Sequence, residues 1–229
     1  MLDFHSHILP GIDDGSHSVK ESCELLCRLS QQGITRVIAT PHFYANNESV
    51  DDFLARRRTA FEALKPHLSS DMPEILLGAE VRYYQGISRL EDLKKLCIEN
   101  SNLLLLEMPF CKWTEYTVKE VMDMNSLGDI GVVLAHIERY MRFHNSEVLL
   151  SLLQRGVLMQ VNASFFLDVF TRGKSLKMLE NRSVQLIGSD CHNLTTRPPR
   201  IGEAFDRIRK KFGDGFVEYI NDFANSLFY

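Results

Sequence analysis

The sequence lacks the features that mark several large classes of protein. Its 26 lysines and arginines are outnumbered by 30 aspartates and glutamates, and the formal net charge of −4 gives no support to a nucleic-acid or anionic-membrane partner. No apolar run approaches the roughly 20 residues that a membrane span needs. The N-terminus also lacks the basic-then-apolar pattern of a signal peptide. We therefore expect a cytoplasmic protein without membrane insertion.

Paired cysteines are missing as well. The five cysteines are odd in number and form no Cys-x-x-Cys pair, which excludes a disulfide framework and a structural zinc finger as first interpretations. No domain linker, low-complexity segment or internal repeat interrupts the 229 residues, of which 45% are hydrophobic. That length can bury one sizeable core, so we expect a single domain over residues 1–229.

Strand-like and helix-like patterns alternate along the chain. β-branched or continuously apolar runs predict strands at residues 1–4, 35–40, 74–81, 103–106, 130–135, 157–161 and 184–187. Helical spacing predicts helices at residues 19–32, 50–65, 90–96, 115–127, 145–155, 165–179 and 202–211, followed by a helical tail. Short connections between strand and helix indicate a parallel sheet, and we predict an α/β fold, a TIM-like (β/α) barrel of seven strands. An open doubly wound sheet is the alternative.

Potential metal ligands follow almost every predicted strand. His5 and His7 lie two apart in an extended segment, so their side chains share one face. The other strand ends carry His42, Glu80, Glu107, His136, Asn162 and Asp190, with His192 close behind. Because the carboxyl ends of parallel strands meet at one edge, these side chains should converge there. A mixed nitrogen and oxygen set suits zinc, manganese or iron(II) better than calcium or magnesium.

Two arginines point to a phosphate substrate. Arg139 follows His136 by three residues and Arg197 follows His192 by five, which places both in loops beside the predicted metals. A guanidinium holds two phosphate oxygens at once and keeps its charge, and close-set metal ions favour phosphoryl transfer to water. Pairing of each arginine with a carboxylate is the plainer alternative.

Several neighbouring residues have ordinary explanations. His17, His67 and His144 lie away from strand ends and are expected at the surface, and Asp13 and Asp14 suit a turn, although Asp14 also suits an outer ligand. Asn162 has no clear metal role and is expected to form hydrogen bonds.

One cysteine sits inside the predicted site. Cys191 and Arg197 satisfy the Cys-x5-Arg spacing of cysteine phosphatases. The intervening residues contain no glycine, two prolines follow, and strand alternation directs Cys191 away from the site, so we interpret this cysteine as a packing residue.

The combined motifs resemble a known superfamily. His5-Ser6-His7, Thr40-Pro41-His42, Gly78-Ala79-Glu80, Glu107-Met108-Pro109, His136-Ile137-Glu138-Arg139-Tyr140 and Gly188-Ser189-Asp190-Cys191-His192-Asn193 are similar to the motifs of the polymerase-and-histidinol-phosphatase superfamily. Within it, the chain resembles bacterial protein-tyrosine phosphatases of capsule and exopolysaccharide operons along nearly its whole length. Only the C-terminal residues 221–229 match no motif.

The resemblance implies a distorted seven-stranded (β/α) barrel with two or three metal ions. Manganese is the expected metal, with iron, zinc, cobalt or magnesium as alternatives. The implied ligands are His5, His7, Asp14, His42, Glu80, Glu107, His136, Asp190 and His192, and Arg139 and Arg197 are the implied catalytic, phosphate-binding residues. The implied reaction removes phosphate from the tyrosine-rich tail of a membrane-associated tyrosine autokinase by direct attack of a metal-bridged hydroxide, without a covalent intermediate.

Three other functions remain open at this point. A small-molecule phosphatase of the same superfamily, such as one acting on histidinol phosphate, would use the same ligands. An amidohydrolase also carries His-x-His on its first strand, but that class commonly uses a carbamylated lysine where this chain offers Glu80 and Glu107. A metal-binding regulator of the kinase without catalytic activity is the third.

Overall fold

The strands of this computed structural model, which describes residues 1–126 and 129–229, all pair in parallel. They are β1 (Leu2–Ser6), β2 (Arg36–Ala39), β3 (His42–Phe43), β4 (Glu74–Leu77), β5 (Glu80–Arg82), β6 (Leu103–Glu107), β7 (Gly131–Leu134), β8 (Leu158–Asn162) and β9 (Leu186–Gly188). Each of the seven predicted strand regions overlaps at least one of them, so the parallel α/β fold is confirmed.

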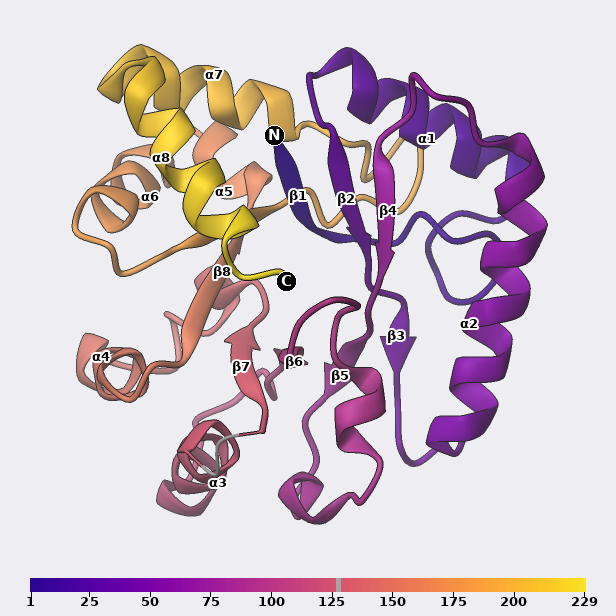
Figure 1. Cartoon of the computed structure of the whole chain (residues 1–229). Helices are drawn as coiled ribbons and strands as arrows, with labels where there is room; N and C mark the ends of the chain where they lie inside the picture. Colours follow the sequence, from indigo (N-terminus) through magenta and orange to yellow (C-terminus); the bar gives the residue numbers. More distant parts are fainter. Residues whose placement is uncertain (127–128) are drawn as a thin grey trace.

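Helices surround the strands, as Figure 1 shows for α1 to α4. The α-helices are α1 (Val19–Gln31), α2 (Val50–Leu64), α3 (Glu115–Ser126), α4 (Ser146–Gln154), α5 (Ala163–Leu167), α6 (Arg172–Glu180), α7 (Ile201–Phe212) and α8 (Asp214–Asn225). Short 3₁₀ turns are η1 (Lys65–His67), η2 (Ile87–Arg89), η3 (Leu93–Leu96) and η4 (Ile137–Arg139). Among the described residues, none of the helices has the length and apolar character needed to cross a membrane.

Two helix predictions need correction, and the end of a third cannot be compared. Residues 90–96 form only the turn η3, because Leu90 and Cys97 on either side of it are extended. The helix predicted at 165–179 is split in two, since Asp168 is extended and its carboxylate accepts hydrogen bonds from the amides of Phe170 and Thr171. The predicted end of the 115–127 helix, Leu127, lies outside the described residues.

The regular closed barrel is not confirmed. One sheet has the order β1-β2-β4 and the other β3-β5-β6-β7-β8-β9. The division falls at Thr40-Pro41, between β2 and β3, and at Gly78-Ala79, between β4 and β5. The strand predicted at residues 74–81 is therefore broken into two, and β3 lies beyond the end of the strand predicted at residues 35–40. Pro41 has no amide hydrogen for a ladder, and the Gly78 carbonyl instead accepts a hydrogen bond of 2.6 Å from the buried Arg57 guanidinium.

The first and last strands meet without a regular ladder. The strands β1 and β9 run side by side, but the pairing at this junction is a single isolated bridge between Ser6 and Cys191. The Asp3 carboxylate takes the place of a ladder acceptor, since its Oδ1 accepts a hydrogen bond of 2.7 Å from the Ser189 amide. The result is a curled parallel sheet.

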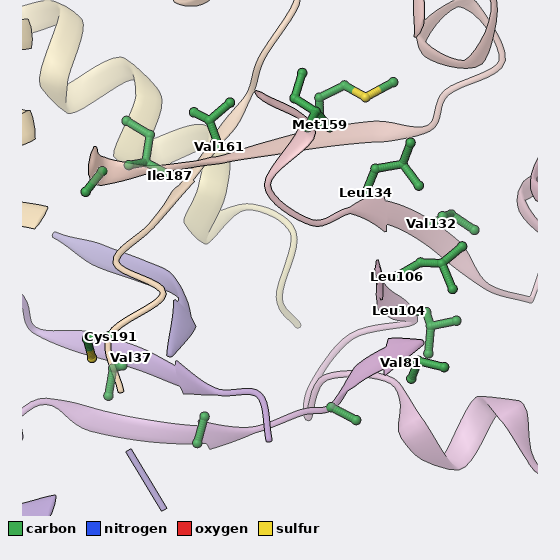
Figure 2. Close-up of a cluster of buried hydrophobic side chains, with 14 of the residues drawn as sticks. Val37, Val81, Leu104, Leu106, Val132, Leu134, Met159, Val161, Ile187 and Cys191 are labelled. Carbon is green, nitrogen blue, oxygen red and sulfur yellow. The ribbon is translucent and has the colours of Figure 1, made fainter. Parts of the chain in front are cut away.

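Alternation along the strands directs the side chains to two buried faces. Figure 2 labels ten side chains of one large apolar cluster, nine from β2, β5, β6, β7, β8 and β9 and one, Cys191, from the segment after β9. They are Val37, Val81, Leu104, Leu106, Val132, Leu134, Met159, Val161, Ile187 and Cys191. The alternate positions are also buried and point to the other side. They include polar residues such as Glu80, Glu107 and Gln160. They also include apolar residues such as Leu105 and Val133, which belong to a second apolar cluster.

Candidate metal centre

The strand register brings the predicted ligands to one edge of the sheet. His42 pairs with Glu80 across β3 and β5, and Arg82 pairs with Glu107 across β5 and β6. His5 lies near the end of β1, and Asp190 follows β9 at the position where its amide donates to the His5 carbonyl, over 2.8 Å. The parallel strands β1, β3, β5, β6 and β9 therefore bring the side chains at their carboxyl ends within reach of one another.

Four of the predicted ligands surround one point. His5 Nε2 and His7 Nε2 lie 3.1 Å apart, and both are 3.3 Å from Oε2 of Glu80. Oδ1 of Asp190 lies 3.6 Å from His5 Nε2 and 3.5 Å from His7 Nε2. All four side chains are at least 96% buried, with exposed fractions of 0 to 4%.

The other predicted ligands extend this cluster in two directions. On one side, His136 Nε2 lies 2.7 Å from Glu80 Oε1 and 3.6 Å from Glu107 Oε1. On the other side, Asp14 Oδ1 lies 3.4 Å from His42 Nε2 and 3.5 Å from His192 Nε2. All nine side chains that the sequence predicts as ligands are thus brought together, and Glu80 lies in the middle.

The geometry of this cluster fits metal ions. Among the described residues, four buried polar side-chain atoms have no hydrogen-bond partner, and Glu80 Oε2 and His192 Nε2 are two of them. Buried polar atoms are normally satisfied, and two imidazole nitrogens 3.1 Å apart need a proton or a cation between them. Three groups of potential ligand atoms each lie within 4.8 Å of one another: His7-Asp14-His42-His192, His5-His7-Asp190 and His42-Glu80-Glu107.

An outer layer of hydrogen bonds holds the histidine rings. His7 Nδ1 lies 2.7 Å from Asp13 Oδ2, which also accepts a hydrogen bond of 3.0 Å from the His42 amide. His5 Nδ1 lies 3.3 Å from Gln160 Oε1, and His136 Nδ1 lies 3.2 Å from the Tyr140 hydroxyl. Such contacts leave Nε2 free for a metal ion and fix the ring orientation.

The sequence did not predict these outer residues. The sequence pattern predicts a turn role for Asp13 and indicates no role for Gln160 or Tyr140. A signal existed for Gln160, since it lies two residues before Asn162 on the same face of β8.

The backbone is strained at two predicted ligands. His136 has φ 33° and Asp190 has φ 51°, a left-handed conformation that non-glycine residues rarely adopt. Residues of this kind concentrate at functional sites, where the surrounding structure maintains them. The backbone before Asp190 also packs closely against β1. A Cβ on Gly188 would lie only 2.5 Å from Cβ of His5, so this position requires glycine.

Burial and opposite charges oppose each other in the cluster. Burial alone would lower the pKa of His7, but Asp13 and Glu80 raise it to about 10. Burial would raise the pKa of Glu80, yet His5 and the neighbouring imidazoles hold it well below its ordinary range. Burial and the adjacent His7 lower the pKa of His192 to about 4. Without a cation the rings compete for protons, which is the behaviour expected of a metal site.

The two predicted phosphate-binding arginines converge on one carboxylate oxygen. An Nη2 atom of Arg139 and one of Arg197 lie 2.6 Å and 2.7 Å from Oδ2 of Asp190. Asn162 Nδ2 donates to the same oxygen over 2.7 Å, which confirms the hydrogen-bonding role expected for Asn162. Three donors therefore surround one oxygen at the edge of a cavity of about 510 Å³.

Cys191 does not face this cavity. Its side chain is fully buried in the apolar cluster, near Val37 in Figure 2. Burial raises the pKa of the thiol above its ordinary value, and Asp3 raises it further. A reactive thiolate needs an electropositive, accessible setting. The interpretation of Cys191 as a packing residue is confirmed.

The remaining histidines lie apart from the cluster. His17 and His67 are exposed, as predicted, whereas His144 is half-buried and its ring packs 4.1 Å from the Trp113 ring.

Comparison with known proteins gives a consistent result. Residues 1–226 match the family model of capsular polysaccharide synthesis proteins CpsB/CapC. The chain is 31% identical to the tyrosine-protein phosphatase YwqE of Bacillus subtilis, over 99% of this chain and 91% of the relative. It is 32% identical to the tyrosine-protein phosphatase CpsB of Streptococcus pneumoniae, over 93% of this chain and 91% of the relative.

Solved structures show the same fold. A structure from the work on YwqE of Bacillus subtilis and CpsB of Streptococcus pneumoniae, which are described as unique metal-dependent tyrosine phosphatases, superposes with a TM-score of 0.84 at 27% identity. It covers 99% of this chain and 94% of that one. A phosphotriesterase homology protein of Escherichia coli shares the fold alone, with a TM-score of 0.54 and 12% identity over 95% of this chain and 94% of that one.

Proposed function

The chain belongs to the CpsB/CapC family of capsular polysaccharide synthesis proteins, and on that premise we propose that it is a metal-dependent protein-tyrosine phosphatase. One observation of this molecule carries the proposal. Oε2 of Glu80 is buried among nitrogens of His5, His7 and His42 at 3.0 to 3.3 Å without a well-formed hydrogen bond. The Asp190 carboxylate links that cluster to the two arginines.

The proposed ligands are the nine residues predicted from the sequence, His5, His7, Asp14, His42, Glu80, Glu107, His136, Asp190 and His192. Their mixture of imidazole and carboxylate, and their three overlapping groups, support two or three manganese ions. When bound, such ions would lower the pKa of water and neutralise negative charge on a phosphoryl group. The nine ligands, seven strand regions and the contact between β1 and β9 also support a distorted seven-stranded barrel in one domain.

Arg139 and Arg197 bind the phosphoryl group in this proposal. Their guanidinium groups already surround an anionic oxygen of Asp190. A phosphoryl group beside Asp190 would meet the same donors, which remain charged at any physiological pH. Donors positioned in advance stabilise the charge that moves toward the leaving oxygen in the transition state. The tyrosine leaving group has a pKa of about 10 and departs more readily than an alkoxide.

The substrate in the cell is proposed from the family resemblance. We propose the phosphorylated tyrosine-rich tail of a membrane-associated tyrosine autokinase that controls polysaccharide export, met by this protein in the cytoplasm. The half-exposed arginines, each with an exposed fraction of 37%, support access by a protein segment.

The test compares two substrates with one manganese-loaded preparation. We expect phosphate release from a phosphotyrosine peptide to exceed that from histidinol phosphate. Arg139→Ala and Arg197→Ala should each reduce kcat/KM for the peptide about 10²–10³-fold, the loss typical of one charge-stabilising donor. Arg209→Ala is the matched control, because Arg209 pairs with Asp206 and Asp214 on the surface away from the cavity.

The alternatives give different results. Hydrolysis of histidinol phosphate without activity on the peptide would make the protein a small-molecule phosphatase. Stoichiometric manganese without activity on either substrate would make it a metal-binding regulator.

A further inference from the structure

A second, more aromatic cavity adjoins the candidate phosphate site. It has a volume of about 460 Å³ and is lined by Phe110, Glu138, Arg139, Arg142, Phe165 and Thr171. Among the described residues, Arg139 alone lines both this cavity and the polar one beside Asp190. A ligand bound by Arg139 therefore has a polar chamber on one side and two phenyl rings on the other.

The Phe110 ring is held in place by the cluster itself. It is stacked on the His136 ring, with centroids 6.1 Å apart and an interplanar angle of 28°, and on Tyr140, at 5.7 Å and 29°. The Arg82 guanidinium, which pairs with Glu107 over 2.6 Å, lies 5.1 Å from the Phe110 centroid. Despite these contacts the side chain is 36% exposed. A fixed, partly open phenyl ring is a ready surface for another flat ring.

We propose that this cavity is the aryl subsite of the enzyme. The phenyl ring of the substrate tyrosine lies against Phe110 and Phe165, while its phosphate is held at Arg139. This inference rests on the proposed phosphatase function and names the group that confers its preference for tyrosine. In an aryl phosphate the ring is attached directly to the ester oxygen, so it must lie beside the groups that bind phosphate. Aromatic pairs prefer the offset or edge contacts that two fixed rings provide.

Aliphatic phosphates cannot use this surface in the same way. The carbon next to the ester oxygen of phosphoserine is a single methylene group, which covers little of Phe110. Removing the phenyl surface should therefore reduce turnover of the aryl substrate more than turnover of the alkyl one. The quantity that tests the proposal is the ratio of the two kcat/KM values.

The first experiment measures kcat/KM for O-phosphotyrosine and O-phosphoserine with manganese-loaded protein. Phe110→Leu should lower the tyrosine-to-serine ratio roughly three- to tenfold, in line with the value of one aromatic pair. Phe110→Tyr should restore the ratio to within about twofold. Phe170→Ala is the control, since Phe170 is 92% exposed and lines neither cavity. Bound manganese is measured for every variant, because Phe110 touches His136.

A second measurement needs no variant. Calorimetry on the manganese-loaded wild-type protein should show phenylphosphonate binding roughly three- to tenfold more tightly than methylphosphonate. Equal affinities, or an unchanged substrate ratio in Phe110→Leu with full metal content, would overturn the aryl subsite while leaving the phosphatase intact. A wild-type protein that hydrolyses phosphoserine and not phosphotyrosine would overturn the proposed function, and the subsite with it.

Discussion

The amino ends of the strands are closed by apolar packing and by paired polar groups, such as Arg36 with Glu74 at 2.8 Å. At the carboxyl ends, by contrast, the buried atoms Glu80 Oε2 and His192 Nε2 have no hydrogen-bond partner among the described residues. The C-terminal segment covers the amino ends, and Figure 1 shows the chain terminus in the middle of the strands. The Leu2 amide donates to Asn221 Oδ1 over 3.0 Å, the Tyr229 amide donates to the Asn100 carbonyl over 3.0 Å, and the Phe4 and Phe228 centroids are 6.3 Å apart.

The difference shows which end supplies stability and which supplies chemistry. The burial of the amino-end cluster lowers the free energy of the folded chain. The cluster includes Leu2, Phe4, Ile38, Leu76, Leu103, Leu105, Val133, Leu186, Phe223, Leu227 and Phe228. The carboxyl-end cluster collects histidines and carboxylates whose burial costs free energy unless a cation compensates it. Changes at the two ends should therefore have opposite signatures, with loss of folding at one and loss of turnover at the other.

Glu80→Gln should have the largest effect on activity. The glutamine side chain carries no negative charge to attract a metal ion or to balance the four imidazoles around position 80. The variant should therefore fail to retain metal at the centre of the cluster. We expect kcat/KM for a phosphotyrosine peptide to drop about 10²–10³-fold or more, since Lewis-acid stabilisation supplies several kcal/mol. Loss of bound manganese should accompany it. A Glu80→Gln variant that keeps both metal and activity would show that Glu80 is not needed for metal binding.

Asp13→Asn should have a smaller effect of the same kind. Asp13 holds the His7 ring and the His42 amide at 2.7 Å and 3.0 Å. Outer hydrogen bonds of this type are worth about 10–100-fold in metal affinity. Manganese titration would measure the change, with Asp123→Asn as the control, because Asp123 contacts Lys119 on the exposed face of α3. Identical affinities in both variants would show that Asp13 is only a turn residue.

Phe228→Ala should affect stability and leave turnover almost unchanged. The half-buried Phe228 ring contacts Phe4 and the Arg36 guanidinium, which lies 5.9 Å from its centroid. We expect a loss of about 1–3 kcal/mol in the free energy of unfolding, less than for a fully buried phenylalanine. Urea unfolding would measure it. A large fall in kcat/KM of the folded, metal-loaded variant would contradict the division between the two ends.

The sequence predicted the order of the elements well and their interruptions poorly. Continuous apolar runs such as Leu103 to Leu106 indicate a strand by themselves, and every predicted strand region overlaps an observed strand. The breaks at Thr40-Pro41 and Gly78-Ala79 depend on contacts that form only in the folded chain, such as the hydrogen bond from Arg57 to Gly78.

The same limit applies to the candidate site. The residues at strand ends could be predicted because alternation and parallel pairing determine where they lie. The roles of Asp13, Gln160 and Tyr140 could not be predicted, since each acts through the far nitrogen of a histidine ring whose orientation the sequence does not define. For Gln160 the pattern of β8 indicates only the face on which it lies. The C-terminal segment matched no motif because its role is apolar packing, for which many sequences suffice.

The smallest predicted effect is a pH dependence of stability outside both clusters. Burial alone would raise the pKa of Glu120, but hydrogen bonds from the Tyr83 hydroxyl at 2.7 Å and the Ser88 hydroxyl at 2.8 Å lower it below its ordinary value of 4.5. A lowered folded pKa stabilises the protein fully above 4.5, and the stabilisation is lost as the pH falls through the folded pKa. The difference in free energy of unfolding between wild type and Glu120→Gln should therefore shrink below pH 4.5. A difference that stays constant from pH 7 to pH 3 would contradict this.

The most direct test of the account is phosphate release from a phosphotyrosine peptide before and after metal removal. It is measured in the wild type, in His136→Ala and in Cys191→Ser. We predict that a chelator abolishes wild-type activity, that manganese restores it, that His136→Ala stays inactive, and that Cys191→Ser keeps its turnover because the thiol faces the apolar cluster. Activity that survives the chelator and disappears in Cys191→Ser would show that the chemistry belongs to the cysteine and not to the carboxyl-end cluster.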